Sequence, residues 1–124
     1  MTVATTAREA GNPPLDGHSL RIGQWLRLRT LTSPSGRVAL VHRHDGELLL
    51  RDSRRTVWSV GSAGIAPGGL VLLSDGDLVL YDDSDWPVWS SGTAGLSVDQ
   101  MLVTDDGAMV LVGTTGRVRW STLP

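Results

Sequence analysis

Short apolar runs alternate with polar turns along most of the chain, and the alternation recurs at a fixed spacing. Three Asp-Gly pairs stand at residues 45–46, 75–76 and 106–107. Each pair is followed two residues later by an apolar run, at 48–50, 78–80 and 109–111. Three Trp-Ser pairs stand 31 residues apart, at 58–59, 89–90 and 120–121. Landmarks that keep this register predict an internal threefold repeat.

The pattern within one repeat is that of antiparallel strands. Asp75-Gly76 lies between the apolar segments 71–73 and 78–81, which favours a hairpin with a type I′ turn, whose two central residues both have positive φ. Asp83-Ser84-Asp85 marks a second turn, into 88–90. No window of eleven residues here has apolar residues at helical spacing, so we expect close to no helix.

A unit of about 31 residues cannot bury its own apolar face, but three copies around a shared axis can. Trp58, Trp89 and Trp120 are predicted to be buried near that axis, because Trp brings the largest apolar area. Trp25 and Trp86 fall outside the register, and we expect them to be more exposed.

These residues resemble the bulb-type mannose-binding lectins, over about Ser19 to Ser121 and including all three repeated Trp residues. The resemblance implies an all-β fold, the β-prism II, with three four-stranded antiparallel sheets around a pseudo-threefold axis. We assign residues 17–124 to this domain, with repeats at about 28–60, 61–91 and 92–121. Residues 1–16 are expected to form a flexible N-terminal arm.

The sugar site of the resembled family is the pattern Gln-x-Asp-x-Asn-x-Val-x-Tyr, once per repeat. Its polar side chains hydrogen-bond mannose hydroxyls, and its Val contacts the sugar ring. The second repeat comes closest, so the resemblance implies a carbohydrate site at Asp75, Asp77, Val79 and Tyr81. Leu73 stands at the Gln position and Asp77 at the Asn position, which removes hydrogen-bond donors. We expect mannose binding weakened by about one to two orders of magnitude.

The other two repeats match less well. The third keeps only Asp106 and Val110 of the five positions, and the first keeps only Asp45. The Asp-Gly turns alone would also explain the three Asp residues. Two functions therefore stay open. One is a mannose-type lectin module; the other is a lectin-fold protein that has lost sugar binding and serves a protein partner or a small-molecule pathway.

Catalytic motifs are missing from the sequence: there is no Cys, no Gly-x-Ser-x-Gly and no phosphate-cradling glycine loop. We therefore expect neither an enzyme nor a cofactor. His42 and His44 lie two apart, on one face of a strand, but lack a third ligand, so no metal is expected. The run 82–85 lacks the Gly and the closing Glu of a calcium loop, which favours a solvated turn.

Charge is divided along the chain. Residues 17–60 contain eight Arg against three acidic residues, and residues 61–110 contain eight Asp and no basic residue. Because nucleic-acid binding needs a net basic footprint, no such partner is expected. Apolar runs are too short to span a membrane, and the N-terminus lacks the apolar stretch of a secretory signal, which favours the cytoplasm. Eleven Arg without Lys suggest the codon usage of a bacterial genome.

The C-terminal segment 116–124 carries the third repeated Trp and reads as a strand that the fold requires. In the resembled family this strand commonly crosses to a neighbouring subunit. We therefore predict a homodimer through the C-terminal strand. Pairing of the strand within its own chain would satisfy it equally.

Overall fold

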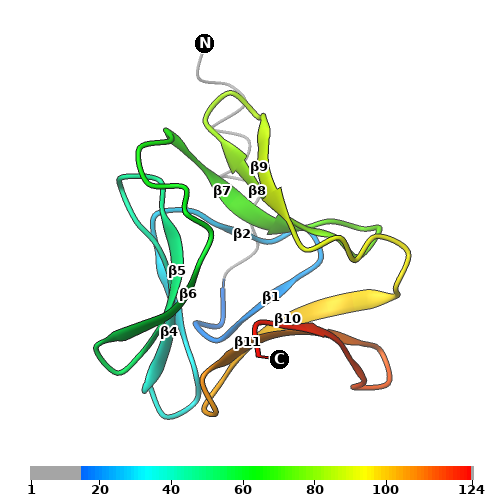
Figure 1. Cartoon of the computed structure of the whole chain (residues 1–124). Helices are drawn as coiled ribbons and strands as arrows, with labels where there is room; N and C mark the ends of the chain where they lie inside the picture. Colours follow the sequence, from blue (N-terminus) through cyan, green and yellow to red (C-terminus); the bar gives the residue numbers. More distant parts are fainter. Residues whose placement is uncertain (1–14, 124) are drawn as a thin grey trace.

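The computed structural model describes residues 15–123, which form twelve β-strands and no helix, and hence no helix able to cross a membrane. The strands make three four-stranded antiparallel sheets arranged around a central axis (Figure 1). One sheet contains β1 (Ser19–Arg21), β10 (Val98–Thr104), β11 (Ala108–Gly113) and β12 (Val118–Ser121). A second contains β2 (Trp25–Leu26), β7 (Pro67–Leu72), β8 (Leu78–Asp82) and β9 (Pro87–Ser90). The third contains β3 (Thr30–Thr32), β4 (Val38–His42), β5 (Leu48–Asp52) and β6 (Arg55–Ser59).

The predicted fold is confirmed, with one addition to its topology. Each repeat supplies three consecutive strands joined by hairpins, and the fourth strand of every sheet comes from residues 19–32. In that segment β1 pairs with β10, β2 with β7 and β3 with β4. The N-terminal part of the domain therefore ties all three sheets together.

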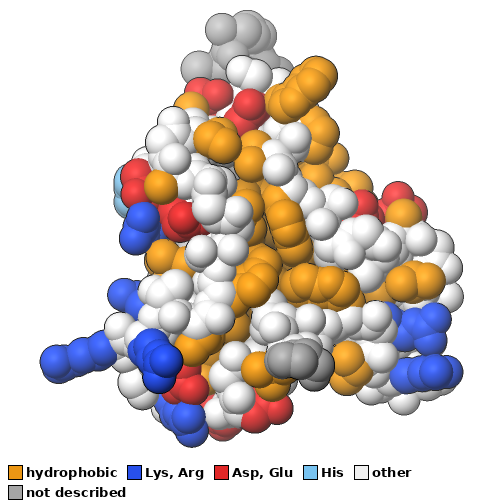
Figure 2. Space-filling model, viewed as in Figure 1, with side chains coloured by type: hydrophobic (Ala, Val, Ile, Leu, Met, Phe, Trp, Pro, Cys, Tyr) orange, Lys and Arg blue, Asp and Glu red, His pale blue; other side chains and the backbone are white. Residues whose placement is uncertain are grey.

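One row of paired residues crosses each sheet and faces the axis. In the third sheet the row runs from Leu31 through Leu40 and Leu50 to Trp58. The other rows are Leu26, Leu70, Leu80 and Trp89, and Leu20, Met101, Leu111 and Trp120. The Leu and Met side chains of these rows are at most 1% exposed and form one core. Figure 2 shows hydrophobic side chains gathered where the three sheets meet.

The three repeated Trp residues lie together at the axis, as predicted. Their ring centroids are 5.4, 5.8 and 6.3 Å apart, in edge-to-face geometry. They are half-buried, not buried, and pack against the core. Trp86 is 71% exposed, as expected. Trp25 is half-buried because its ring lies over Gly69, where a Cβ atom would come within 2.9 Å of it.

The Asp-Gly pairs form hairpin turns, but the predicted type I′ geometry is wrong. Only the glycines, Gly46, Gly76 and Gly107, have positive φ, at 92–93°. In the second repeat, the N–H of Gly76 donates to the carbonyl of Leu73, and the N–H of Leu73 donates to the carbonyl of Asp77. This is the pattern of a type I turn closed by a glycine bulge, in which only one residue needs a left-handed conformation.

The predicted N-terminal arm lies outside the described residues except for its last two. Leu15 packs against the core. The Asp16 carboxylate accepts hydrogen bonds from the N–H groups of His18 and Ser19 and from the Ser19 hydroxyl. Contacts with the domain therefore begin by residue 15.

Candidate functional site

The four candidate residues of the second repeat lie on one hairpin. Val79 and Tyr81 alternate with the core residues Leu78 and Leu80, so they face away from the axis. Asp75 and Asp77 belong to the turn before β8. On the same outer face the ring of Trp25, from β2, lies 5.9 Å from that of Tyr81.

Two polar groups of this hairpin are available to a ligand. The exposed Asp75 carboxylate accepts one hydrogen bond, from the N–H of Asp77 at 2.9 Å. Within the described residues the half-buried Tyr81 makes no side-chain hydrogen bond. A sugar hydroxyl could therefore bind either group without displacing a protein contact.

Asp77 and Val79 are less accessible. Oδ1 of Asp77 accepts hydrogen bonds from the Ser91 hydroxyl at 3.0 Å and from the N–H groups of Gly92 at 3.0 Å and Thr93 at 3.3 Å. It thereby holds the turn that leaves the repeat. Val79 is only 5% exposed. The second carboxylate oxygen of Asp77 therefore remains accessible to a ligand, whereas little of the Val79 side chain does.

In the first repeat the Asp of the pattern is already occupied. Asp45 accepts hydrogen bonds from the Arg43 guanidinium at 3.1 and 2.7 Å, which lower the pKa of its carboxyl. Glu47, 8% exposed, accepts hydrogen bonds from the N–H groups of Gly61 and Ser62. Glu47 thus holds the exit turn of this repeat, as Asp77 does in the second.

In the third repeat the Asp of the pattern, Asp106, is also engaged by a neighbouring side chain. The Thr104 hydroxyl donates a hydrogen bond to Asp106. Ala108 stands where Glu47 and Asp77 stand in the other repeats, so this position supplies no side-chain acceptor. Val110 is half-buried. The first position of the sugar pattern holds Arg43, Leu73 or Thr104 in the three repeats. Leu73 has no hydrogen-bond donor, so Asp75 in the second repeat has no side-chain partner. The residue type at this position, two residues before each Asp, could therefore have indicated from the sequence which Asp is engaged.

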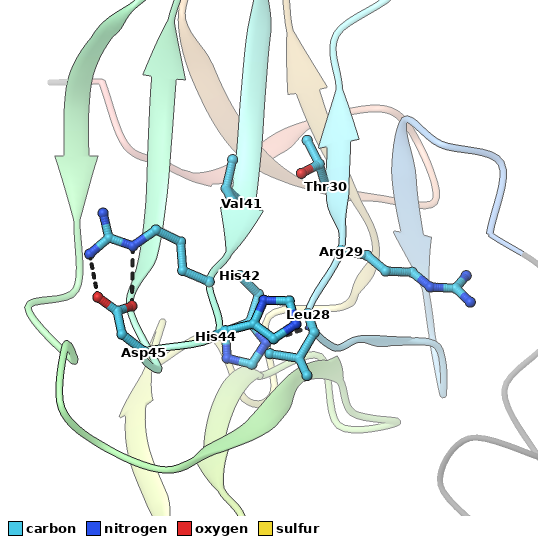
Figure 3. A pocket seen from close by; sticks show the side chains of 8 residues that line it. Leu28, Arg29, Thr30, Val41, His42, His44 and Asp45 are labelled. Atoms are coloured by element: carbon cyan, nitrogen blue, oxygen red, sulfur yellow. Dashed lines mark hydrogen bonds and ion pairs between the residues drawn. The ribbon is translucent and has the colours of Figure 1, made fainter.

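Sequence reasoning did not anticipate a pocket of about 480 Å³ beside the end of β4 (Figure 3). Its lining is Leu28, Arg29, Thr30, Val41, His42, Arg43, His44 and Asp45. His42 is buried and His44 is exposed. Among the described residues no group of three or more His, Asp or Glu side chains could hold a metal ion.

Comparison with known proteins gives matches among solved structures. No protein-family model matches the chain, and no curated protein matches it. A Japanese Marasmius oreades lectin superposes with a TM-score of 0.79 at 28% identity, covering 86% of this chain and 91% of that one. A monomeric monocot mannose-binding lectin from Gastrodia elata gives 0.76 at 25%, covering 86% and 96%. The snowdrop (Galanthus nivalis) mannose-specific agglutinin, in complex with methyl-α-D-mannoside, gives 0.69 at 27%, covering 86% and 95%.

The three sheets and these matches define the class as a lectin fold of the β-prism II type. Within that class the chain is similar to the monocot mannose-binding lectins, the resemblance that its sequence predicted. Each of these three neighbours is a lectin.

Proposed function

We propose that this chain is a non-catalytic carbohydrate-binding module with one weak mannose-type site, in the second repeat. The observation that carries the proposal is the state of the three repeated Asp residues. Arg43 holds Asp45 and Thr104 holds Asp106, whereas Asp75 accepts only a backbone hydrogen bond. The mannose-binding proteins among the structural neighbours support the choice of sugar.

Binding at this site needs hydrogen bonds and an apolar contact, but no proton transfer. The free positions on the Asp75 carboxylate accept hydrogen bonds from sugar hydroxyls, and the Tyr81 hydroxyl can donate or accept. The second oxygen of Asp77 adds an acceptor. The Trp25–Tyr81 pair offers an apolar surface to the sugar ring. Because Leu73 supplies no polar atom, the site is weaker than the complete pattern.

Substitution of the Asp residues tests the site. Titration with methyl α-D-mannoside, followed by NMR, suits weak binding. We expect Asp75→Ala to weaken binding at least tenfold. Asp106→Ala, the same change in the third repeat, should leave it within twofold. Equal binding by the Asp75→Ala variant and the parent would place the sugar elsewhere or nowhere.

A second candidate function is that of a lectin-fold protein without sugar binding, which serves a protein partner or a small-molecule pathway. The burial of Val79 and the engagement of Asp77 favour it, because both reduce what the site offers a sugar. The absence of any mannoside-induced shift in the parent protein would support this candidate.

The homodimer stays a prediction. β12 pairs with β11 of its own chain, so the sheet that contains it is complete without a partner. Light scattering on the full chain distinguishes a mass of 13.2 kDa from twice that value.

A further inference from the structure

A second pocket, of about 300 Å³, lies at the turn between β11 and β12 in the third repeat. Its volume is at the lower end of the range for small-molecule sites. Of the described residues that line it, two are basic, Arg117 and Arg119, three carry hydroxyl groups, Ser97, Thr114 and Thr115, and none is acidic. All five side chains are exposed, so a ligand can reach them. Figure 2 shows basic side chains gathered beside this turn.

The two guanidinium groups of this pocket have no ionic partner. Neither the Arg117 nor the Arg119 side chain makes a hydrogen bond or an ion pair within residues 15–123. In the first repeat, by contrast, Arg37 pairs with Asp52 at 2.7 Å. Because an Arg side chain stays charged at any ordinary pH, the pocket has two uncompensated positive charges.

The turn over residues 113–117 has the same backbone hydrogen bonds as the turn over residues 82–86 in the second repeat. In each turn the N–H of the first residue donates to the carbonyl of the fifth, and the N–H of the fourth donates to the carbonyl of the first. The first residue differs: it is Asp82 in the second repeat and Gly113 in the third. The turn of the third repeat therefore has the same backbone without the carboxylate.

The carboxylate of Asp82 satisfies two N–H groups of its own turn. Its Oδ1 accepts the N–H of Ser84 at 2.8 Å and that of Trp86 at 2.9 Å. The corresponding N–H groups, of Thr115 and Arg117, have no acceptor within residues 15–123. Both residues line the pocket. An anion can therefore place an oxygen where the second repeat has its carboxylate, since successive backbone N–H groups in a turn bind anions.

We propose that this pocket binds a phosphate dianion, free or at the end of a small phosphomonoester. One phosphate oxygen accepts the N–H groups of Thr115 and Arg117, as the Asp82 carboxylate does in its own turn. The guanidinium groups of Arg117 and Arg119 bind the other oxygens and balance the two negative charges. A dianion is favoured over a carboxylate because the two Arg charges are uncompensated. This site goes beyond the proposed mannose-type function and does not depend on it.

NMR titration of the full chain at pH 8, with inorganic phosphate and methyl phosphate as probes, tests the proposal. Both probes are almost fully dianionic at that pH. We expect both to shift the backbone amide signals of Thr115 and Arg117. The amide signals of Ser84 and Trp86 should not move, because the Asp82 carboxylate already accepts those N–H groups.

Comparison ligands test the preference for a dianion. Methyl sulfate has the shape of methyl phosphate but one negative charge, and acetate is planar with one negative charge. Each should bind at least tenfold more weakly than the two probes. Tighter binding of methyl phosphate would support an ester as the ligand, and tighter binding of inorganic phosphate would support the free ion.

Two matched Arg variants separate a local contact from the general charge of the molecule. Arg117 and Arg55 are both exposed, and each stands three residues before the repeated Trp of its sheet. Arg117→Gln should weaken phosphate binding about tenfold. Arg55→Gln makes the same change in the first repeat and should alter binding less than twofold.

Two variants at Gly113 test the position of the missing carboxylate. Gly113→Asp supplies the acceptor that Asp82 provides in the second repeat, so it should abolish phosphate binding. Gly113→Ala adds a Cβ atom 3.0 Å from the Ser97 carbonyl oxygen, as Gly113→Asp also does, but adds no carboxylate. It should bind phosphate within about threefold of the parent.

Four results would each overturn the proposal: no binding of either probe, unmoved Thr115 and Arg117 amide signals, equal binding of methyl sulfate or acetate, or equal losses within either pair of variants. Asp75→Ala, which tests the mannose-type site, should leave phosphate binding unchanged. Failure of one site is thereby distinguished from failure of the other.

Discussion

At the residue scale, carboxylates serve two purposes in this molecule. Glu47 and Asp77 each place one oxygen against successive backbone N–H groups and hold the chain as it leaves a repeat. Asp75 instead projects from its turn with little engagement. Two Asp residues of one motif therefore differ in how far their carboxylates are engaged, because the next segment of the chain encloses Asp77 and leaves Asp75 exposed.

Substitutions at Asp77 test its structural role. Asp77→Ala removes the acceptor for three donors and should lower the free energy of unfolding by about 1–3 kcal/mol. Asp77→Asn keeps an oxygen acceptor in the same place and should cost less than about 1 kcal/mol. Urea denaturation measures both. If the two variants lose equal stability, the charge of Asp77, not its position as an acceptor, supports the turn.

His42 makes stability depend on pH. Burial lowers its pKa to about 4 in the folded chain, compared with 6.5 for an imidazole exposed to water, as in the unfolded chain. As the pH falls from 6.5 to 4, the unfolded chain takes up a proton that the folded chain does not. The free energy of unfolding should therefore fall by about 2–3 kcal/mol across that window.

His42→Asn serves as the control for this pH dependence, because its amide oxygen can still accept the N–H of Leu28, as Nδ1 of His42 does, but cannot titrate. Urea denaturation at pH 6.5, 5.5 and 4.5 should show a flatter dependence in the variant. An equally steep fall in parent and variant would assign the pH dependence to other groups.

At the element scale, the hairpins of the repeats were predictable, and the three short strands that precede them were less so. The three Asp-Gly pairs and the apolar runs located β4–β5, β7–β8 and β10–β11. The strands β1, β2 and β3 have two or three residues each, too few for a period to show. Their places follow from pairing with three different repeats, which no local pattern reveals.

The candidate site was predictable to a similar extent. The motif identified Asp75 and Tyr81 in the second repeat. It did not reveal that Asp77 is bonded to residues 91–93 or that Trp25 covers this face, because those contacts join segments distant in sequence. The turn type was mispredicted because Asp-Gly suits both a type I′ turn and a glycine bulge.

Two glycines with similar backbone conformations should respond differently to Ala. Gly46 and Gly116 have φ values of 93° and 81°. A Cβ atom on Gly46 would lie 1.8 Å from the backbone oxygen of Ile65, whereas nothing lies within 4 Å at Gly116. Gly116→Ala should cost about 1 kcal/mol of backbone strain, and Gly46→Ala about 3 kcal/mol or more. Thermal unfolding followed by circular dichroism compares them; equal midpoints would contradict the close approach of these turns.

At the scale of the whole molecule, the three repeats close into a ring around the axis. The third repeat returns to the first through Asp105, which accepts hydrogen bonds from the N–H and hydroxyl of Ser35. The Trp cluster joins one side chain from each sheet. Stability should therefore depend on all three repeats together.

Loss of one Trp from the cluster tests this dependence. Trp89→Ala removes edge-to-face contacts with both other rings and should lower the free energy of unfolding by about 3 kcal/mol. Trp86→Ala, at an exposed position, should change it by less than about 0.5 kcal/mol. Urea denaturation should remain one cooperative transition in both. Similar losses in the two variants would contradict a shared axial core.

We propose that the second repeat retains a mannose-type site, weakened by Leu73 and Asp77. Calorimetric titration of methyl α-D-mannoside into the Leu73→Gln, Asp77→Asn double variant and into the parent tests it most directly. The variant restores the missing donors while the amide oxygen of Asn keeps the exit turn in place. We expect the double variant to bind at least tenfold more tightly than the parent. A folded variant that binds no better than the parent would contradict it.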